Sequence, residues 1–391
     1  MKRTDYDVAV IGAGPGGSVT ARKLAKLGHS VVLLEKRERI GYPVRCGEAS
    51  TKLDSLEQDY GPIDPACIET VLNGLYVYGP GGINLDVRRE NVGVMLNREK
   101  FDPWLAHLAE LDGAEIAVNA RVESVSGVEG GVRTLSVVTA AERVQIRAKM
   151  VVCAEGVEAR IARSLGIKAI QKPGETCTGV DIQVQGILTR PDYLTFWQGH
   201  DFINDGYIWS FPKRKSDVTN FGAGFLVSSY RGESIESVTL GWLKKLYPDA
   251  KVNKVVGGLV PVSGSLESYV LDRFAAVGDA AHHTNPLTGG GISTAMRAGK
   301  AAAEIIHEGF AAGDLSAKFL QRYERRCEEL FGREHAREKR FRKFLLTRNK
   351  EDQIDAYGLI RDYIDGGESK FAAFKKPGRA IRLLWDYLRF K

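Results

Sequence analysis

The sequence contains few cysteines and lacks long apolar runs. Its five cysteines are widely spaced, odd in number and free of any CxxC pair, which argues against a disulfide framework or a zinc site and favours a reducing cytosol. No stretch reaches the ~18 uninterrupted apolar residues of a membrane-spanning helix. Glycines break the apolar segment 8–21 and aspartates precede it, so it does not have the pattern of a signal peptide. We find no internal repeat or low-complexity tract.

The composition is that of a folded globular protein. The chain has 391 residues, 43% of them hydrophobic and 27% charged, which predicts two or three structural units. Its 43 glycines exceed ordinary usage and indicate tight turns or close approach of the backbone to a ligand. The net charge of +6 is unevenly placed, because residues 331–391 hold 16 Lys and Arg but only 9 Asp and Glu. The excess of positive charge therefore lies in the C-terminal region.

Hydrophobic periodicity gives a coarse map of the chain. Segments 7–11 and 29–35 are typical of buried strands and enclose a helical segment at 18–27, which together form a β-turn-α-β unit. Short alternating segments between 179 and 258 predict a separate, largely antiparallel sheet. The remaining expected elements are strands within 122–144, at 149–154 and at 275–279, and helices at 101–111, at 291–310 and after 332.

The glycine-rich segment 12–17 (GAGPGG) fits GxGxxG between the first strand and the first helix. Its glycines permit a tight turn and close approach to a pyrophosphate, which the helix N-terminus then binds. The acid at the end of the next strand suits ribose hydroxyls and disfavours a 2′-phosphate, so FAD or NAD(H) is expected. The residues expected to bind the dinucleotide here are Gly12, Gly14, Pro15, Gly16, Gly17 and Glu35.

A second segment, 274–292 (FAAVGDAAHHTNPLTGGGI), resembles the late FAD-binding element of the flavoprotein hydroxylase superfamily. The resemblance implies that Asp279 holds a ribityl hydroxyl and that the following glycine turn and helix N-terminus face the flavin pyrimidine edge. A helix N-terminus favours the negative charge of reduced flavin there. By the same resemblance Arg98 starts a cofactor-contacting helix and Val122 offers its backbone to adenine. The glycine turn and helix start comprise Gly289, Gly290, Gly291 and Ile292.

Two further segments resemble the geranylgeranyl reductase family. Residues 42–48 (YPVRCGE) match its PxxCGE motif, and residues 206–213 (GYIWSFPK) match its YxWxFP motif. The resemblance extends over about the first 300 residues. It implies that Cys46, Gly47 and Ala49 lie at the flavin, although a lone cysteine is more often an inert buried thiol.

The YxWxFP segment also has a physical interpretation of its own. On a strand, Tyr207, Trp209 and Phe211 face the same side, and Pro212 is expected to end the ladder. Such an aromatic wall suits isoprenoid carbons, whereas without the family match it is ordinary sheet core. Reduction of an isolated C=C bond needs a hydride and a proton, and Cys46 and Tyr207 are both candidate proton donors.

These observations predict an α/β chain of mixed α+β character. A Rossmann-like FAD-binding domain carries an inserted antiparallel β-sheet substrate domain and a C-terminal helical region. The expected bounds are 1–73, 98–175 and 261–331 for the FAD-binding domain, 74–97 and 176–260 for the substrate domain, and 332–391 for the basic helical region.

The resemblance to the geranylgeranyl reductases implies FAD-dependent hydrogenation of geranylgeranyl chains in ether phospholipids as the expected function. An FAD-dependent aromatic monooxygenase or halogenase is one alternative, and a non-catalytic flavin-binding protein that docks on membranes is another. The electron donor stays open between ferredoxin and NAD(P)H, because the chain has one clear GxGxxG motif. The segment 151–160 resembles a further superfamily element, with Glu155 where relatives carry Asp. His282 and His283 lack the neighbours of a metal site, so no metal is expected.

The basic C-terminal region has three interpretations. Its pieces 337–343 (REKRFRK) and 381–391 (IRLLWDYLRFK) carry several cations among apolar side chains. No nucleic-acid recognition motif accompanies them, so nucleic acid is not an expected partner. A solvated helical surface is the simple alternative, whereas an anionic lipid substrate favours a tail that lies on the bilayer. We therefore expect a cytoplasmic protein that associates peripherally with the inner face of the cell membrane.

Overall fold

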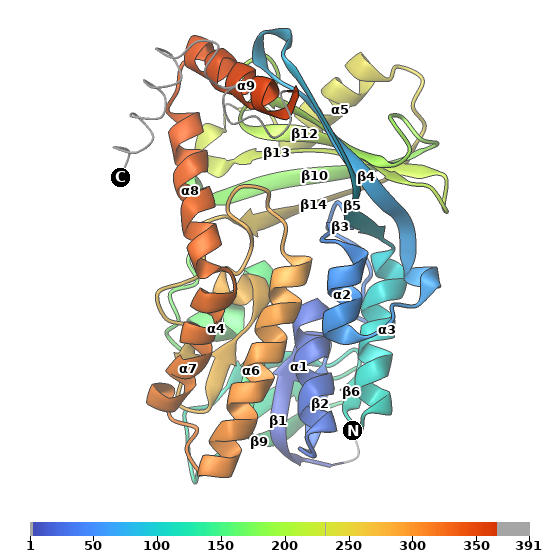
Figure 1. Cartoon of the computed structure of the whole chain (residues 1–391). Coiled ribbons are helices and arrows are strands. Elements are labelled where there is room, and N and C mark those ends of the chain that lie inside the picture. Colours follow the sequence, from blue (N-terminus) through green and yellow to red (C-terminus); the bar gives the residue numbers. More distant parts are fainter. Residues whose placement is uncertain (1–2, 231, 366–391) are drawn as a thin grey trace. The chain divides into compact units, whose positions relative to one another are not determined.

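A computed structural model describes residues 3–230 and 232–365, and its chain divides into two compact units (Figure 1). Unit 1 comprises Met1–Val44, Arg98–Gln171 and Val260–Ala336. Unit 2 comprises Arg45–Asn97, Lys172–Leu259 and a segment that begins at Arg337. Residues 45–73, which the sequence predicts as part of the FAD-binding domain, cluster with unit 2. The reason is that β4 (Ile68–Tyr78) pairs with strands of the second sheet rather than the first.

Unit 1 is built on a sheet whose central strands are parallel. β9 (Arg143–Cys153), β1 (Asp5–Ile11) and β2 (Val31–Leu34) run side by side and are buried along most of their length. Burial on both faces explains the continuous apolar sequences of Val8–Ile11 in β1, of β2 and of Met150–Cys153 in β9, whereas residues 143–149 of β9 alternate between exposed and less exposed positions. The other strands are β6 (Glu115–Ala117), β7 (Arg121–Val125), β8 (Arg133–Val138), β15 (Val270–Leu271) and β16 (Phe274–Ala276).

The helices of unit 1 include α1 (Pro15–Lys26) and α6 (Ile292–Ala312), which pack directly against each other (Figure 1). A Cβ at Gly299 of α6 would lie 2.5 Å from the carbonyl oxygen of Gly16 in α1, so the two backbones approach closely. Thr20 donates a hydrogen bond to the Gly299 carbonyl oxygen at 3.2 Å. The other helices are α3 (Arg98–Leu111), α4 (Arg160–Ser164) and α7 (Ala317–Cys327).

Unit 2 is built on a second sheet, in the order β14-β10-β13-β12-β11-β4-β5-β3. The pairs in its centre are antiparallel, whereas β11 and β4 are parallel, so the sheet is largely antiparallel, as expected. The strands are β3 (Ala49–Ser50), β4, β5 (Asn84–Leu96), β10 (Thr176–Gln185), β11 (Tyr193–Gly199), β12 (Ile203–Lys213), β13 (Val218–Leu226) and β14 (Val252–Pro261). Unit 2 also contains α2 (Leu53–Tyr60).

Two local predictions for this region are wrong. β12 continues past Pro212 to Lys213, because the pairing with β11 involves β12 only up to Ser210 and leaves the proline one strand neighbour, β13. The region 179–258, expected to consist of short strands and turns, also contains the helix α5 (Ile235–Leu246). Ser234 caps this helix through its hydroxyl, and Leu243 is buried against the sheet.

The C-terminal helices are α8 (Arg333–Leu346) and α9 (Lys350–Asp365). Lys339 pairs with Glu175 at 2.9 Å and Arg342 is buried, so two cations of the run 337–343 are packed within unit 2 rather than displayed. The second basic piece, 381–391, lies outside the described residues. In the part of the chain that the structure describes, no helix is long and apolar enough to cross a membrane.

Candidate functional site

The glycine turn after β1 leaves no room for side chains at two positions. Gly12 has φ +101°, and a Cβ there would lie 2.4 Å from the carbonyl oxygen of Ala154. A Cβ at Gly17 would lie 1.9 Å from the carbonyl oxygen of Gly12. Both glycines are therefore required by the close packing of strand, turn and helix.

Gly14 has a different environment, because no atom lies within 4 Å of the position that a Cβ would take. It is the N-cap of α1, and no side chain caps this helix, whose first turn contains Pro15. The N–H groups at the start of α1 are thus left for another acceptor. Open space beside unpaired N–H groups fits a pyrophosphate.

The start of α6 meets the start of α1. Gly291 is the N-cap of α6, again without a side-chain cap. A Cβ at Gly16 would lie 3.0 Å from the carbonyl oxygen of Ala295, in the first turn of α6. Gly289, with φ +73°, and Gly290 form the turn that leads into Ile292. The structure therefore brings together two glycine motifs that the sequence predicts to share one cofactor.

Asp279 joins this cluster. Its Oδ1 accepts a hydrogen bond from the hydroxyl of Thr284 at 3.0 Å, and a Cβ at Gly291 would lie 3.2 Å from the same oxygen. Burial raises the pKa of Asp279, while the Thr284 hydrogen bond and the charge of Arg98 oppose the rise. The Arg98 guanidinium is held by Asp102 through two hydrogen bonds of 3.0 and 2.5 Å. Asp102 thus orients Arg98 at the start of α3, and neither Asp102 nor Thr284 was singled out by the sequence.

The Glu35 carboxylate lies directly beneath the glycine turn. Its two oxygens accept hydrogen bonds from the backbone N–H groups of Ala13 and Arg37, each at 3.0 Å. Each carboxylate oxygen has a second lone pair, so a ribose hydroxyl still finds an acceptor. Val122 is buried, and its carbonyl oxygen accepts a hydrogen bond from Arg160 at 3.4 Å. The roles predicted for Glu35 and Val122 toward FAD stay predictions.

Both histidines after Asp279 are buried. A nitrogen of the His282 ring lies 2.7 Å from the hydroxyl of Ser263, and the Nδ1 of His283 accepts from the backbone N–H of Gly278 at 3.3 Å. Burial lowers the pKa of His283 to about 3. Across residues 3–230 and 232–365, no group of three or more His, Cys, Asp or Glu side chains is placed to hold a metal ion.

Together these features fit FAD in unit 1. The two uncapped helix N-termini, with the open position at Gly14, offer N–H donors for phosphates. The Glu35 carboxylate and the buried Asp279 offer acceptors for hydroxyl groups.

The CGE part of the PxxCGE segment belongs to unit 2, where Glu48 anchors it. Glu48 adopts φ +66°, an uncommon conformation for a residue other than glycine. Its Oε2 accepts from the ammonium of Lys213 at 2.7 Å and from the amide of Asn220 at 2.8 Å, and all three side chains are buried. The backbone N–H of Glu48 donates to the Cys46 sulfur at 3.2 Å. Glu48 thus fixes the backbone at Cys46, Gly47 and Ala49, whose contact with FAD stays a prediction.

The aromatic residues of β12 form a continuous strip, as the alternation predicts. Tyr207 and Trp209 have ring centroids 5.8 Å apart, and Trp209 and Phe211 have centroids 6.1 Å apart. Phe196 of β11 lies edge-on to Phe211. A Cβ at Gly47 would lie 3.1 Å from the Phe211 ring. The CGE segment and the aromatic strip are therefore in contact within unit 2.

The hydroxyl of Tyr207 is buried at the aromatic strip. Burial raises its pKa, and the nearby Cys177 and Cys46 raise it further. Burial also raises the pKa of Cys177, to about 11. Tyr207 and Cys177 therefore keep their protons at neutral pH, as a proton donor requires. The sequence did not single out Cys177, Lys213, Asn220 or Asp181 as site residues. Glu48 and Lys213 stood within quoted motifs, but nothing local indicated that they pair.

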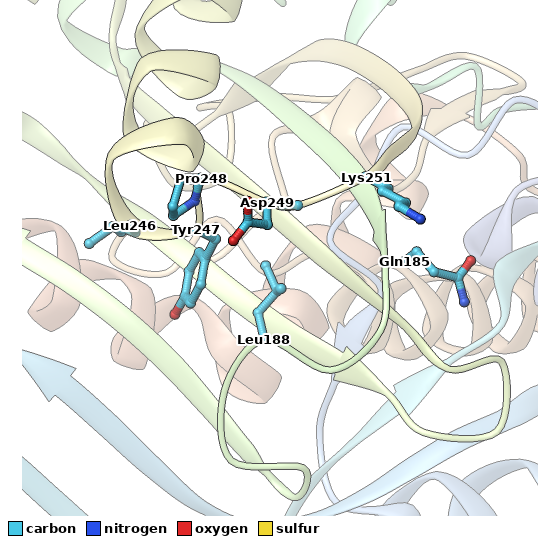
Figure 2. Close-up of a pocket in the computed structure, with 8 residues that line it drawn as sticks. Gln185, Leu188, Leu246, Tyr247, Pro248, Asp249 and Lys251 are labelled. Atoms are coloured by element: carbon cyan, nitrogen blue, oxygen red, sulfur yellow. The ribbon is translucent and has the colours of Figure 1, made fainter.

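Unit 2 also contains a separate cavity of about 500 Å³ at the C-terminal end of α5 (Figure 2). None of the residues predicted from the sequence lines it. Its lining residues are Gln185, Leu188, Leu246, Tyr247, Pro248, Asp249, Ala250 and Lys251.

Comparison with known proteins identifies two families. The FAD binding domain family matches residues 5–205, and the geranylgeranyl reductase catalytic domain family matches residues 175–260. A digeranylgeranylglycerophospholipid reductase from Methanothrix thermoacetophila is 36% identical over 352 residues, covering 88% of this chain and 89% of that protein. Digeranylgeranylglycerophospholipid reductase 2 from Methanococcoides burtonii is 34% identical over 386 residues, covering 97% of this chain and 94% of that protein.

Solved structures give the same fold. A geranylgeranyl bacteriochlorophyll reductase-like protein from Thermoplasma acidophilum has a TM-score of 0.88 at 30% identity, covering 98% of this chain and 99% of that chain. A flavin-dependent brominase has a TM-score of 0.72 at 19% identity, covering 99% of this chain and all of the brominase chain. At that identity the likeness to the brominase concerns the fold alone.

Proposed function

This chain belongs to the geranylgeranyl reductase family, and we propose that it is an FAD-dependent reductase that hydrogenates C=C bonds in the geranylgeranyl chains of ether phospholipids. One observation carries the proposal. The region that matches the reductase catalytic domain contains the aromatic strip Tyr207, Trp209 and Phe211, in contact with the CGE segment. An apolar, aromatic surface suits a methyl-branched hydrocarbon chain.

The protein must supply a proton and stabilise developing positive charge. FAD, when bound in its reduced form, supplies the hydride to one alkene carbon. We propose Cys46 and Tyr207 as candidates for the group that protonates the other carbon, because Tyr207 belongs to the aromatic strip and Cys46 to the CGE segment that contacts the strip. The faces of Tyr207, Trp209 and Phe211 carry negative quadrupole potential that favours a nearby cation.

The reaction is tested with the FAD-loaded protein, reduced by dithionite without oxygen and supplied with digeranylgeranylglyceryl phospholipid. Mass spectrometry should detect the gain of two hydrogen atoms for each double bond reduced. An unchanged lipid would overturn the proposal. Consumption of oxygen and NAD(P)H with an aromatic substrate would support the monooxygenase alternative, and absence of any turnover would support the non-catalytic one.

We propose ferredoxin or NAD(P)H as the electron donor. The one GxGxxG motif forms part of the FAD-binding cluster, and the Glu155 carboxylate accepts from the backbone N–H groups of Arg160 and Ile161, each at 2.8 Å. Glu155 therefore caps the first turn of α4. Segment 151–160 thus offers no separate element for binding a nicotinamide. Stopped-flow bleaching of flavin absorbance by each reduced donor distinguishes them.

We also propose peripheral association with the cytoplasmic face of the membrane through the basic C-terminal region. The support is the charge of residues 331–391 and the anionic nature of the proposed substrate, because cations near an anionic surface contribute ~1 kcal/mol each. Deletion of residues 366–391 is the appropriate variant, since α8 and α9 belong to the described fold. Flotation with anionic liposomes should weaken with salt and after the deletion. Equal flotation of both proteins would exclude this role for the tail.

A further inference from the structure

The indole of Trp209 lies against three glycines of the neighbouring strands, at one of which a side chain would clash with the ring. Gly222 on β13 is the register partner of Trp209, and a Cβ there would lie 2.1 Å from Cζ2 of the indole. A Cβ at Gly224 would lie 3.6 Å from the ring, and one at Gly179 of β10 would lie 3.7 Å from it. Gly222 is thus needed for the ring to lie against the sheet.

The indole N–H is held by an acidic side chain on β10. Trp209 Nε1 donates to Oδ1 of Asp181 at 3.0 Å, and Asp181 is only 8% exposed. A buried indole N–H needs an acceptor, and this hydrogen bond also fixes the rotation of the ring in its plane. A Cβ at Gly47 would lie 3.4 Å from the same nitrogen, so the ring edge also adjoins the CGE segment.

We infer that Asp181 is a positioning residue that holds the indole of Trp209 flat on the sheet, as a fixed part of the surface that receives the isoprenoid chain. The inference rests on the proposed function, because it takes the aromatic strip as that surface. A ring that is already immobile loses no further freedom when the chain binds, so the hydrogen bond acts on substrate affinity through Trp209.

The charges around Asp181 agree with this role. Burial raises the pKa of Asp181 to about 8; the Trp209 hydrogen bond lowers it, nearby Glu48 raises it, and Lys213 and Lys254 lower it. The raised pKa favours the protonated, neutral form of the carboxyl group. A neutral acceptor can hold the indole without placing an ionised carboxylate beside an apolar lining.

The test compares two replacements of Asp181. Asp181→Asn keeps an oxygen acceptor for the indole, whereas Asp181→Leu has similar size and no acceptor. With reduced, FAD-loaded enzyme and digeranylgeranylglyceryl phospholipid, the Leu variant should raise KM by about fivefold to tenfold, the range that one lost hydrogen bond spans. Its kcat should change little, and the Asn variant should keep a KM within about twofold of the wild type.

A second readout does not depend on turnover. Each protein is paired with the same protein carrying Trp209→Phe, and the difference between their fluorescence spectra isolates the emission of Trp209. This emission should change in the Leu variant and be retained in the Asn variant. Asp181→Ala replaces the Leu variant if leucine prevents folding, as judged by circular dichroism and FAD content.

Three outcomes would overturn the inference. An unchanged KM and unchanged Trp209 emission in the Leu variant would remove the positioning role. An equal rise in KM in the Asn and Leu variants would assign the effect to the carboxyl group itself and not to its hydrogen bond with Trp209. Asp181→Leu should also have no further effect on KM once Trp209→Phe is present, so an additive effect would show that Asp181 does not act through Trp209. If the wild type leaves the lipid unsaturated, the proposed function fails, and the fluorescence comparison still tests the orientation of the ring.

Discussion

The ammonium of Lys213 donates a hydrogen bond to the carboxylate of Glu48 over 2.7 Å, and both side chains are about 95% buried. Glu48 lies in the segment that precedes β3, whereas Lys213 ends β12, so the pair ties the CGE segment to the sheet that carries the aromatic strip. A charge buried in this way is costly when its partner is removed.

We therefore expect Lys213→Met to destabilise the protein by about 3 to 5 kcal/mol, because it leaves the Glu48 carboxylate buried without its cation. Adding Glu48→Gln should recover part of the loss. The measurement is urea unfolding of each variant. Lys36→Met is the control, because the Lys36–Glu158 pair is 40% and 44% exposed and should contribute only about 1 kcal/mol or less. Equal effects of the two lysine replacements would contradict the prediction.

Replacements in the glycine turn should separate folding from cofactor binding. Gly17→Ala places a methyl group 1.9 Å from a carbonyl oxygen and should cost about 1 to 3 kcal/mol or more in the apoprotein. Gly14→Ala meets no protein atom within 4 Å, so the apoprotein should keep its stability, whereas FAD affinity should fall by about tenfold or more as the methyl group enters the phosphate space. Apoprotein melting and flavin titration measure the two effects. FAD binding by the Gly14 variant with wild-type affinity would place the pyrophosphate elsewhere.

Two buried histidines predict sensitivity to acid. Burial lowers the pKa of His283 to about 3 and that of His335 to about 4, with smaller contributions from neighbouring charged groups. Unfolded histidine titrates near 6.5, so the unfolded chain binds more protons between these values. These two groups therefore lower stability as the pH falls from about 7 toward 4.

His335→Phe keeps a ring beside Phe331, whose centroid lies 5.1 Å away, but cannot titrate. Urea unfolding from pH 7 to pH 5 should show a shallower loss of stability in this variant, by up to about 1.4 kcal/mol per pH unit. His107, which is 59% exposed, provides the control His107→Gln. The same pH slope in the wild type and in His335→Phe would contradict the burial argument.

Replacement of the two candidate proton donors should affect turnover and spare the cofactor. Loss of a general acid costs about 10²-fold to 10⁴-fold in rate, so either Cys46→Ala or Tyr207→Phe should lower kcat by about this factor. The variant with the larger loss identifies the donor, provided that its flavin spectrum is unchanged. Losses below about threefold in both variants would exclude both residues as the acid.

Local patterns in the sequence were enough to predict several features of the fold and the site. The glycine turn, the helix that it opens and the second glycine motif each depend on neighbouring residues. The common face of Tyr207, Trp209 and Phe211 follows from the two-residue period of a strand. By contrast, α5 was missed because its apolar residues were interpreted as alternating strand residues.

The sequence by itself determined which residue types stand at the dinucleotide turn and on the aromatic strip, because these depend on spacing along the chain. Only the tertiary structure decided which distant groups meet. The contact of α1 with α6, the Glu48–Lys213 pair and the Trp209–Asp181 hydrogen bond all require strands and helices from separate segments to pack in one register. A shift of one residue in β12 would turn Trp209 away from Asp181, and no local pattern fixes that pairing, because it depends on the packing of the whole sheet.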